Sequence, residues 1–299
     1  MTASNLERPI ASLFPSRDFI ERLEWVDSPM TQTPQPTRHI RVGCHLTYSL
    51  PEPGPLMFVL EAQNDRDQRL IQSERSLEPI VYRDMHGNLI WRVLAGAGEL
   101  QVRSDQVFEV TSSLDAVSPG LQRTLVQDLP DEVIVYTLPS RYCQSDLFLQ
   151  DAWTMFGHVQ GGWAQVQAVC DWLHANLTYS AGSTSNPSAL EAYRARTAVC
   201  RDFAHLGISF CRALSIPARY VSGYLPEIGV IPDGLPMDFH AWFQVYLNGA
   251  WWTFDARHNK PRTGRVVIAI GRDAADVAFS TVYGATQLVS MQVWADEIA

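Results

Sequence analysis

The sequence contains few cysteines, and their number and spacing exclude two kinds of cross-linked fold. Its 299 residues include five cysteines, an odd number, and no two of them form a Cys-x-x-Cys pair. Neither a disulfide framework nor a structural zinc cluster is therefore expected. A reducing compartment fits this pattern and would keep single thiols available for chemistry. The five residues are Cys44, Cys143, Cys170, Cys200 and Cys211.

Long apolar runs and basic runs are also absent. Nowhere do 18 apolar residues follow one another, and charged residues interrupt positions 1–20, where a signal peptide would need an apolar centre. We therefore expect a cytoplasmic protein that does not associate with membranes. The net charge is −9 and no cluster of Lys or Arg occurs, so nucleic-acid binding, which needs a basic surface, is not expected.

What the sequence does contain is typical of a soluble globular enzyme. Hydrophobic residues make up 46% and charged residues 18%, and the length is sufficient for two hydrophobic cores. Residues 1–37 carry several prolines among scattered charges and are interpreted as an irregular extension. The remainder divides near residue 145 into a strand-rich domain, 38–145, and a second domain, 146–299.

The strand-rich domain is predicted from alternating and short apolar runs. From Arg38 to Leu50 apolar and polar residues alternate, the period of a half-buried strand. Several short strands without long helices indicate a β-sandwich. The further strand candidates are 56–60, 80–82, 89–93, 100–102 and 107–110, separated by turn signals that include Ser104-Asp105. Cleavage in the polar stretch 112–131 is expected to release a stable C-terminal fragment.

The second domain begins with helices and ends with strands. Apolar residues at helical spacing predict helices over 148–158, 163–177 and 188–194, with a polar loop over 179–187. A strand is predicted over 220–225, followed by a Pro- and Gly-rich loop over 226–236 that could overhang a cleft. The alternating segments 265–270 and 287–295 are expected to complete the sheet of this domain.

Cys200 stands at the start of the most informative helix. Apolar residues from Phe203 to Leu214 recur every three or four positions, which predicts an amphipathic helix buried on one side and ended before Pro217. A thiolate at the first turn is stabilised by the helix dipole, but only by about 0.3–1 kcal/mol. An isolated free cysteine is usually a small buried apolar residue, so a nucleophile also requires a cationic neighbour.

A predicted hairpin supplies that neighbour. Residues 238–247 alternate in polarity, Asn248-Gly249 is a strong signal for a two-residue turn, and residues 250–255 return. Counting outward from the turn matches the apolar faces and places Asp255 diagonally opposite His240 on one face. A nucleophile, a base and an orienting carboxylate form a thiol triad, which is the interpretation favoured for Cys200, His240 and Asp255.

Other assignments stay open at the level of sequence. A lone His on a strand or an Asp at a strand end is often only structural. His205, on the Cys200 helix, is a rival base, although it lies on the helix flank rather than at its open end. The Cys200 backbone N–H is a natural oxyanion donor, with Tyr179 or Trp242 as candidates for the second donor.

Four segments together resemble the bacterial transglutaminase-like family, whose members are often described as cysteine proteases. They are Val199-Cys-Arg-Asp-Phe-Ala-His205, Ile216-Pro-Ala-Arg-Tyr-Val-Ser-Gly-Tyr224, Asp238-Phe-His-Ala-Trp242 and Trp251-Trp-Thr-Phe-Asp255. The order Cys, His, Asp and the intervals of 40 and 15 residues match that family. The motifs cover roughly residues 160–275, and Ala198 departs from the glycine that family members often have two residues before the Cys.

The resemblance implies an α+β fold in which an N-terminal β-sandwich precedes a papain-like transglutaminase core, with helices packed on an antiparallel sheet. It implies Cys200 as nucleophile, His240 as base and then acid, and Asp255 as the residue that orients His240. The expected activity is thiol-dependent acyl transfer on amide or peptide bonds, most simply hydrolysis, because transamidation needs a second site that excludes water. The alternatives are protein-glutamine transamidation, a more distant arylamine acetyl transfer, and a catalytically silent binding module using Trp242, Tyr246, Trp251 and Trp252.

No cofactor, metal or calcium control is expected, because no Asp-rich loop with calcium-binding spacing occurs. The expected partner is a peptide or another amide-containing substrate, and the oligomeric state stays open.

Overall fold

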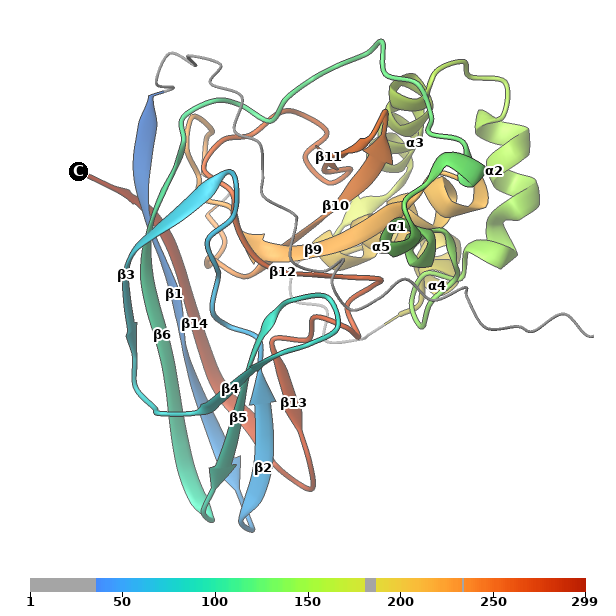
Figure 1. Ribbon diagram of the computed structural model, residues 1–299. Helices are drawn as coiled ribbons and strands as arrows, with labels where there is room; N and C mark the ends of the chain where they lie inside the picture. The colour runs from blue at the N-terminus through green and yellow to red at the C-terminus, as the bar shows by residue number, and fades with distance from the viewer. Residues whose placement is uncertain (1–35, 181–186, 233) are drawn as a thin grey trace, which may run out of the picture. The chain divides into compact units, whose positions relative to one another are not determined.

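The computed structural model describes residues 36–180, 187–232 and 234–299 (Figure 1). The expected irregular extension, 1–37, falls outside the described residues except for its last two positions, and so does most of the expected loop at 179–187. Residues 35–299 cluster into one unit, and the account below concerns the described part of that unit.

Two four-stranded antiparallel sheets contain the strands of the N-terminal half (Figure 1). Their strand orders are β14-β1-β6-β3 and β13-β2-β5-β4. The alternating apolar residues of β1, including Ile40, Val42 and Leu46, are buried, and Tyr48 meets Phe58 of the other sheet at a ring distance of 5.6 Å. The strands are β1 (Thr37–Leu50), β2 (Gly54–Phe58), β3 (Gln68–Arg75), β4 (Ile80–Arg83), β5 (Leu89–Ala95), β6 (Gly98–Thr111), β13 (Ser280–Val282) and β14 (Gln287–Ile298).

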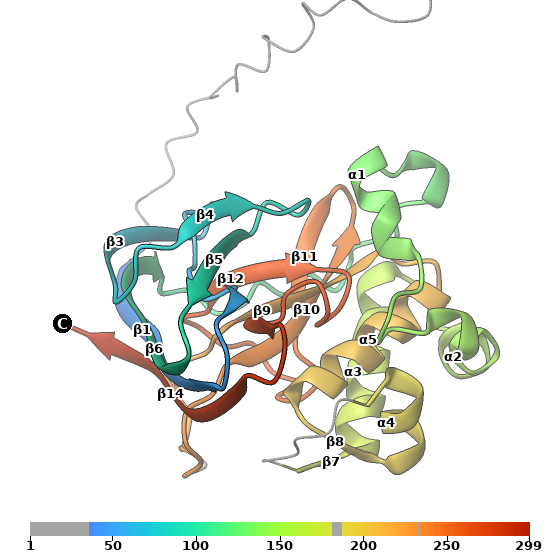
Figure 2. The same ribbon diagram turned by 90° about the horizontal axis from the view of Figure 1, so that it is seen from below.

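A third antiparallel sheet, with the order β11-β10-β9-β12, lies between these sheets and the helices (Figures 1 and 2). Its strands are β9 (Ala218–Tyr224), β10 (His240–Leu247), β11 (Ala250–Phe254) and β12 (Val266–Gly271), and a small parallel pair joins β7 (Thr178–Tyr179) to β8 (Thr197–Ala198). The helices are α1 (Asp131–Ile134), α2 (Leu149–Phe156), α3 (Gly162–Asn176), α4 (Ala189–Ala195) and α5 (Cys200–Ala213). The expected α+β class, antiparallel sheets followed by helices on a sheet, is confirmed.

Helix α5 packs directly on strand β10, and a glycine permits the close approach. A Cβ atom at Gly207 would lie 2.5 Å from the ring of Phe243, closer than side-chain atoms can approach. On its other side α5 contacts α2, α3 and α4. The expectation that α5 is buried on one side only is therefore wrong, since residues 202–213 are all buried. The apolar stripe predicted the side that faces the sheet but carried no signal for the helices that cover the opposite side.

Two details of the first half also differ from expectation. Ser104-Asp105 was expected to break two short strands, yet β6 runs through it without interruption. The Asp105 side chain accepts hydrogen bonds from Arg41 and Arg103, and these pairs stabilise a polar residue inside a strand. Strand β3 was not expected at all, because most of its residues are exposed and its apolar pattern is weak.

The C-terminal strand joins a different sheet from the one expected. Residues 265–270 do complete the third sheet as β12, which pairs with β9. Residues 287–295 do not, because β14 pairs with β1 along almost its whole length, and β13 pairs with β2. Alternating polarity predicts a strand but does not specify its partner. The domain boundary near residue 145 stays a prediction, with the qualification that the last two strands belong to the N-terminal sheets.

The Cys200 helix carries a buried imidazole on its second turn. His205 is 0% exposed and stacks between Tyr142 and Tyr220, with ring distances of 5.2 and 5.1 Å. Its Nε2 accepts a hydrogen bond from the backbone N–H of Ala274. Burial lowers the pKa of His205 to about 3, so the ring is neutral in the folded protein at ordinary pH.

Of the helices that the structure describes, none has the length and apolar character needed to span a bilayer.

Cleavage within residues 112–131 tests the strand topology. The pairs β1–β14 and β2–β13 join segments on opposite sides of this stretch. With a specific protease site inserted there, we therefore expect the two pieces to co-elute in native size-exclusion chromatography and to separate only in denaturant. The sequence-based expectation was the opposite, and a folded C-terminal piece eluting alone would restore it.

The neutral state of His205 predicts a loss of stability in acid. The unfolded ring takes up a proton below its ordinary pKa of 6.5, whereas the folded ring stays neutral down to about 3. Between these values the unfolded state binds more protons, so the free energy of unfolding falls by about 1.4 kcal/mol for each pH unit of acidification. Urea unfolding at several pH values should show a shallower pH dependence for His205→Gln than for the wild type. Parallel pH dependences for the two proteins would contradict this assignment.

Candidate active site

Cys200 is the first residue of α5, as the sequence predicted. The preceding backbone is held by the β7–β8 pair, in which Ala198 lies opposite Tyr179. The side chain of Asp202 accepts the backbone N–H of Val199 at 3.0 Å and so caps the first turn. The thiol of Cys200 donates to the carbonyl oxygen of Phe239 at 3.9 Å. The sulfur therefore lies beside the residue that precedes His240.

The hairpin that carries His240 forms in the predicted register. Asn248 and Gly249 have φ angles of 49° and 83°, the positive values that a two-residue turn of this kind requires. Beyond the turn, the pairs Leu247–Ala250, Val245–Trp252 and Phe243–Phe254 match the count made from sequence. The ladder ends at Phe254, and Asp255 follows directly after it. The chain therefore brings Asp255 to the side of the sheet on which His240 lies.

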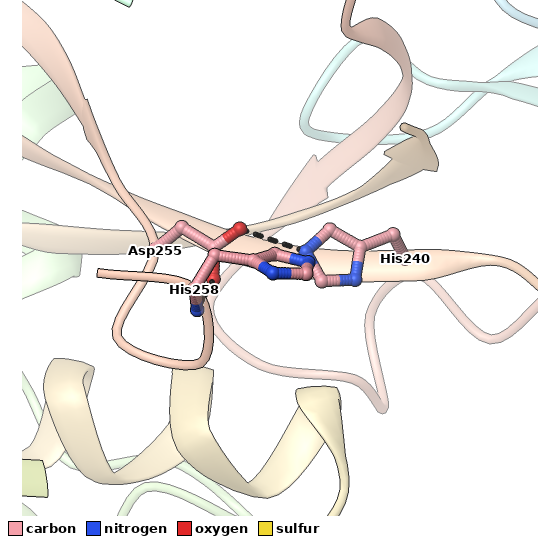
Figure 3. Close-up of side chains that lie close together, drawn as sticks. All are labelled: His240, Asp255 and His258. Carbon is pink, nitrogen blue, oxygen red and sulfur yellow. Dashed lines mark hydrogen bonds and ion pairs between the residues drawn. The ribbon is translucent and has the colours of Figure 1, made fainter. Parts of the chain in front are cut away.

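His240 and Asp255 form a short hydrogen bond in a buried setting (Figure 3). The ring Nε2 lies 2.8 Å from the carboxylate Oδ2, and the two residues are 6% and 8% exposed. Because an ionised carboxylate only accepts, Nε2 carries the hydrogen and Nδ1 is the nitrogen left for another partner. The Cys200 side chain lies close enough to act on the His240 ring electrostatically. The structure thus brings together all three residues singled out from the sequence.

The electrostatics of this group favour charged forms of His240 and Asp255. Burial by itself would lower the pKa of His240, but the Asp255 carboxylate and the Cys200 side chain outweigh it and raise this pKa above its ordinary value. Burial would raise the pKa of Asp255, yet His240, Arg265 and His258 hold it well below the usual range. The helix dipole alone stabilises a thiolate only weakly. An imidazolium at His240 beside the sulfur is the cationic neighbour that a nucleophilic cysteine needs.

Three further residues at the site were not singled out from the sequence: Arg265, His258 and Asp115. Arg265 donates from Nη2 to Asp255 Oδ2 at 3.3 Å, and its Nε donates to both oxygens of Asp115 at 3.0 Å. The backbone N–H of His258 donates to Asp255 Oδ1 at 3.3 Å, and its ring lies 5.1 Å from the His240 ring (Figure 3). The short distance in sequence between Asp255 and His258 is the signal that could have found His258. Asp115 and Arg265 are 150 positions apart, and no local pattern joins them.

His240, Asp255 and His258 are also the group of described residues whose donor atoms lie close enough to hold a metal ion, within 4.8 Å of one another. The nearest donors of His240 and Asp255 are already paired with each other. The guanidinium of Arg265 lies against the same carboxylate oxygen and supplies its positive charge. We therefore assign no metal site here.

The other four cysteines differ from Cys200 in their surroundings. All four are buried, whereas Cys200 is partly exposed. Burial raises the pKa of Cys44 and of Cys143 to about 12, and it also raises the pKa of Cys170 and Cys211. Such thiols are largely protonated at neutral pH, and among the cysteines only Cys200 combines access with a neighbouring imidazole.

The remaining candidates from the sequence are placed as follows. His205 is a buried residue of α5 whose Nε2 is occupied by the N–H of Ala274, so it is not positioned as a base for Cys200. Trp242 is 1% exposed, and its ring stacks on His240 at 6.0 Å. Tyr179 is partly exposed beside Ala198, with the guanidinium of Arg257 over its ring at 3.8 Å. Of the two suggested oxyanion donors, only Tyr179 lies at the surface of the site.

Comparison with solved structures finds a close counterpart. A protein of Cytophaga hutchinsonii, whose crystal structure is described as that of a "putative cysteine protease", is 32% identical in sequence. The two structures agree with a TM-score of 0.80 over 88% of this chain and 92% of that one. Both the helix-on-sheet core and the strands before it are therefore shared.

Comparison with known sequences points in the same direction. A protein of Mycobacterium leprae is 33% identical over 188 residues, which are 60% of this chain and 66% of that protein. A protein of Mycobacterium tuberculosis strain H37Rv is 35% identical over 117 residues, and the match spans 37% of its length. The model of the transglutaminase-like superfamily matches residues 152–256, the segment that contains Cys200, His240 and Asp255. On these matches, the chain belongs to the transglutaminase-like superfamily.

Proposed function

We propose that this protein is a cysteine acyl-transfer enzyme that hydrolyses amide or peptide bonds through a thioester on Cys200. The observation that carries the proposal is the convergence of three side chains from separate elements: a sulfur at the start of α5, an imidazole on β10 and a carboxylate after β11. A nucleophile, a general base and an orienting group are the parts that thiol-dependent acyl transfer requires. The description of the Cytophaga hutchinsonii protein supports the same reaction class.

In the proposed reaction His240 moves one proton in each direction. It takes the proton of the Cys200 thiol, and the thiolate attacks the amide carbonyl carbon to give a tetrahedral oxyanion. As the C–N bond breaks, the imidazolium gives its proton to the leaving amine and a thioester remains. Water then adds to the thioester with His240 as base, and the C–S bond breaks to release the carboxylic acid and restore the thiol. Asp255 keeps the ring oriented and stabilises its protonated form.

Two donors are proposed for the oxyanion. The backbone N–H of Cys200 is one of the unpaired N–H groups in the first turn of α5, at the positive end of its dipole. Tyr179 is the proposed second donor, because β7 runs alongside the segment that leads into Cys200. Each such donor typically contributes about 10²–10³ in rate.

The alternative of a silent binding module is less well supported by the packing of its aromatic residues. Trp242 and Tyr246 are buried, and Trp251 packs edge-on against Tyr136 and Tyr246 at 5.3 Å. Trp252 meets Trp163 at 5.8 Å. These side chains pack against neighbouring rings and guanidinium groups, so they do not form the exposed patch that a binding surface needs.

Selective alkylation tests the proposed nucleophile. Iodoacetamide at pH 7 should modify Cys200 well before the four buried thiols, because only a thiolate reacts and only Cys200 has an imidazolium beside it. In His240→Ala the rate at Cys200 should fall severalfold, because the imidazole that accepts the proton of the thiol is gone. The measurement is mass spectrometry of peptides over time. Equal and slow labelling of all five cysteines would favour the binding module.

The choice between hydrolysis and transamidation can be tested on the acyl-enzyme. Incubation with a peptide library should leave a mass increase on Cys200 that is absent in Cys200→Ala. Because hydrolysis needs only solvent access, we expect this adduct to decay to free acid at the same rate with and without an added primary amine. An amine-dependent decay that yields a new amide would identify the protein as a transamidase instead.

A further inference from the structure

We infer that Arg265 and Asp115 are positioning residues of this site, and that their partly buried ion pair holds Asp255 and balances the charge it presents to His240. The inference rests on the proposed function, because it concerns how the Cys200–His240 pair exchanges its proton. It assigns a role to a segment outside the helix-on-sheet core, since Asp115 follows strand β6 of the N-terminal sheets.

The geometry of Arg265 places it between two carboxylates. Its Nη2 reaches the Asp255 oxygen that also accepts the hydrogen bond from His240, and its Nε reaches both oxygens of Asp115. The Arg265 side chain is 8% exposed. Its guanidinium carbon also lies 4.8 Å from the ring of Trp242, which stacks on His240. The guanidinium therefore contacts both Asp255 and Trp242, the two residues that hold the His240 ring.

Asp115 is held in place by backbone contacts as well as by Arg265. Its Oδ2 accepts the backbone N–H of Arg262 at 2.9 Å, and its own N–H donates to the Arg262 carbonyl oxygen at 2.7 Å. These bonds tie the segment after β6 to the loop that leads into β12. The Asp115 carboxylate is therefore fixed relative to Arg265 on a rigid framework, as a positioning role requires.

The charges along this path alternate. Asp115 is negative, Arg265 positive and Asp255 negative, and the His240 ring, whose protonated form is favoured, follows beside Cys200. Buried charges are screened far less than exposed ones, so each member affects the next. Loss of the positive Arg265 should strengthen proton binding by the Cys200–His240 pair. Loss of the negative Asp115 leaves Arg265 uncompensated and should weaken proton binding by the same pair.

Other titratable or charged groups also face this site, and they are unchanged in the variants below. Among the described residues they are Cys170 of α3, Arg201 and Asp202 of α5, Tyr220 of β9, and Asp238, His258 and Arg262 of the loops.

The test is the pH dependence of alkylation at Cys200 in the full chain, with iodoacetamide as the probe. In wild type the rate rises with pH around a midpoint at which the thiol–imidazole pair loses its first proton. In Arg265→Gln this midpoint should move up, and in Asp115→Asn it should move down, each by about 0.5–1 pH unit for a buried charge several ångströms away. The double variant should return close to the wild-type midpoint.

Three controls separate charge from structure. Arg265→Lys keeps the charge but not the fork of donors, so its midpoint should stay near wild type while the limiting rate falls. Asp105→Asn removes a carboxylate that also bonds two arginines, but in the N-terminal sheet, and should leave the midpoint unchanged. Circular dichroism and thermal melting establish which variants are folded.

The outcomes distinguish the two proposals. If wild-type Cys200 is not labelled selectively, the proposed function fails before the variants are compared. If it is labelled, midpoints that do not move, or that move in the same direction in Arg265→Gln and Asp115→Asn, overturn the role of the ion pair. The proposed function is then unaffected. Should Arg265→Gln fail to fold, Asp115→Asn decides: a downward shift supports the inference, and no shift or an upward shift refutes it.

Discussion

The buried carboxylate of Asp255 is the group on which the candidate site depends. An ionised carboxylate taken out of water costs several kcal/mol unless donors and charges compensate it. Here the compensation comes from the Nε2–H of His240, the guanidinium of Arg265 and the backbone N–H of His258. Because these donors come from β10, from the segment before β12 and from the turn after β11, the buried carboxylate is compensated only when the third sheet has formed.

The position of the sulfur depends on packing as well as on the polar contacts of the first turn of α5. Helix α5 is covered by the sheet on one side and by other helices on the other, and Gly207 lets it lie directly against Phe243. A small shift of this helix along β10 would carry Cys200 away from His240. The dense packing around α5 therefore stabilises the fold and also maintains the distance on which a proton transfer depends.

The N-terminal sheets are joined to the core more closely than the order of the chain suggests. Strands β13 and β14 return from the end of the sequence to pair with β2 and β1, and Asp115 connects the segment after β6 to the loop before β12. The side chain of Gln68 in β3 also hydrogen-bonds to the backbone of Val267 in β12 in both directions. These contacts make the N-terminal sheets part of the support of the site.

Much of the arrangement was readable from local patterns. The turn at Asn248-Gly249 and the alternation on either side predicted the register of β10 and β11, and with it the meeting of His240 and Asp255, because a two-residue turn leaves only one register in which the apolar faces match. The start of α5 at Cys200 followed from periodicity. Only the resemblance of the combined motifs to a known family indicated that Cys200, at the start of α5, would meet the hairpin.

The sequence by itself determined most of the elements, the hairpin register and the meeting of His240 and Asp255, since each rests on spacing within a short stretch of chain. Tertiary structure alone decided that β14 pairs with β1, that α5 is covered on both sides, and that Arg265 and Asp115 stand behind Asp255. The physical reason is that side-chain periodicity specifies which face of an element is apolar, whereas the partner of that face is chosen by packing and charge pairing between segments far apart in the chain.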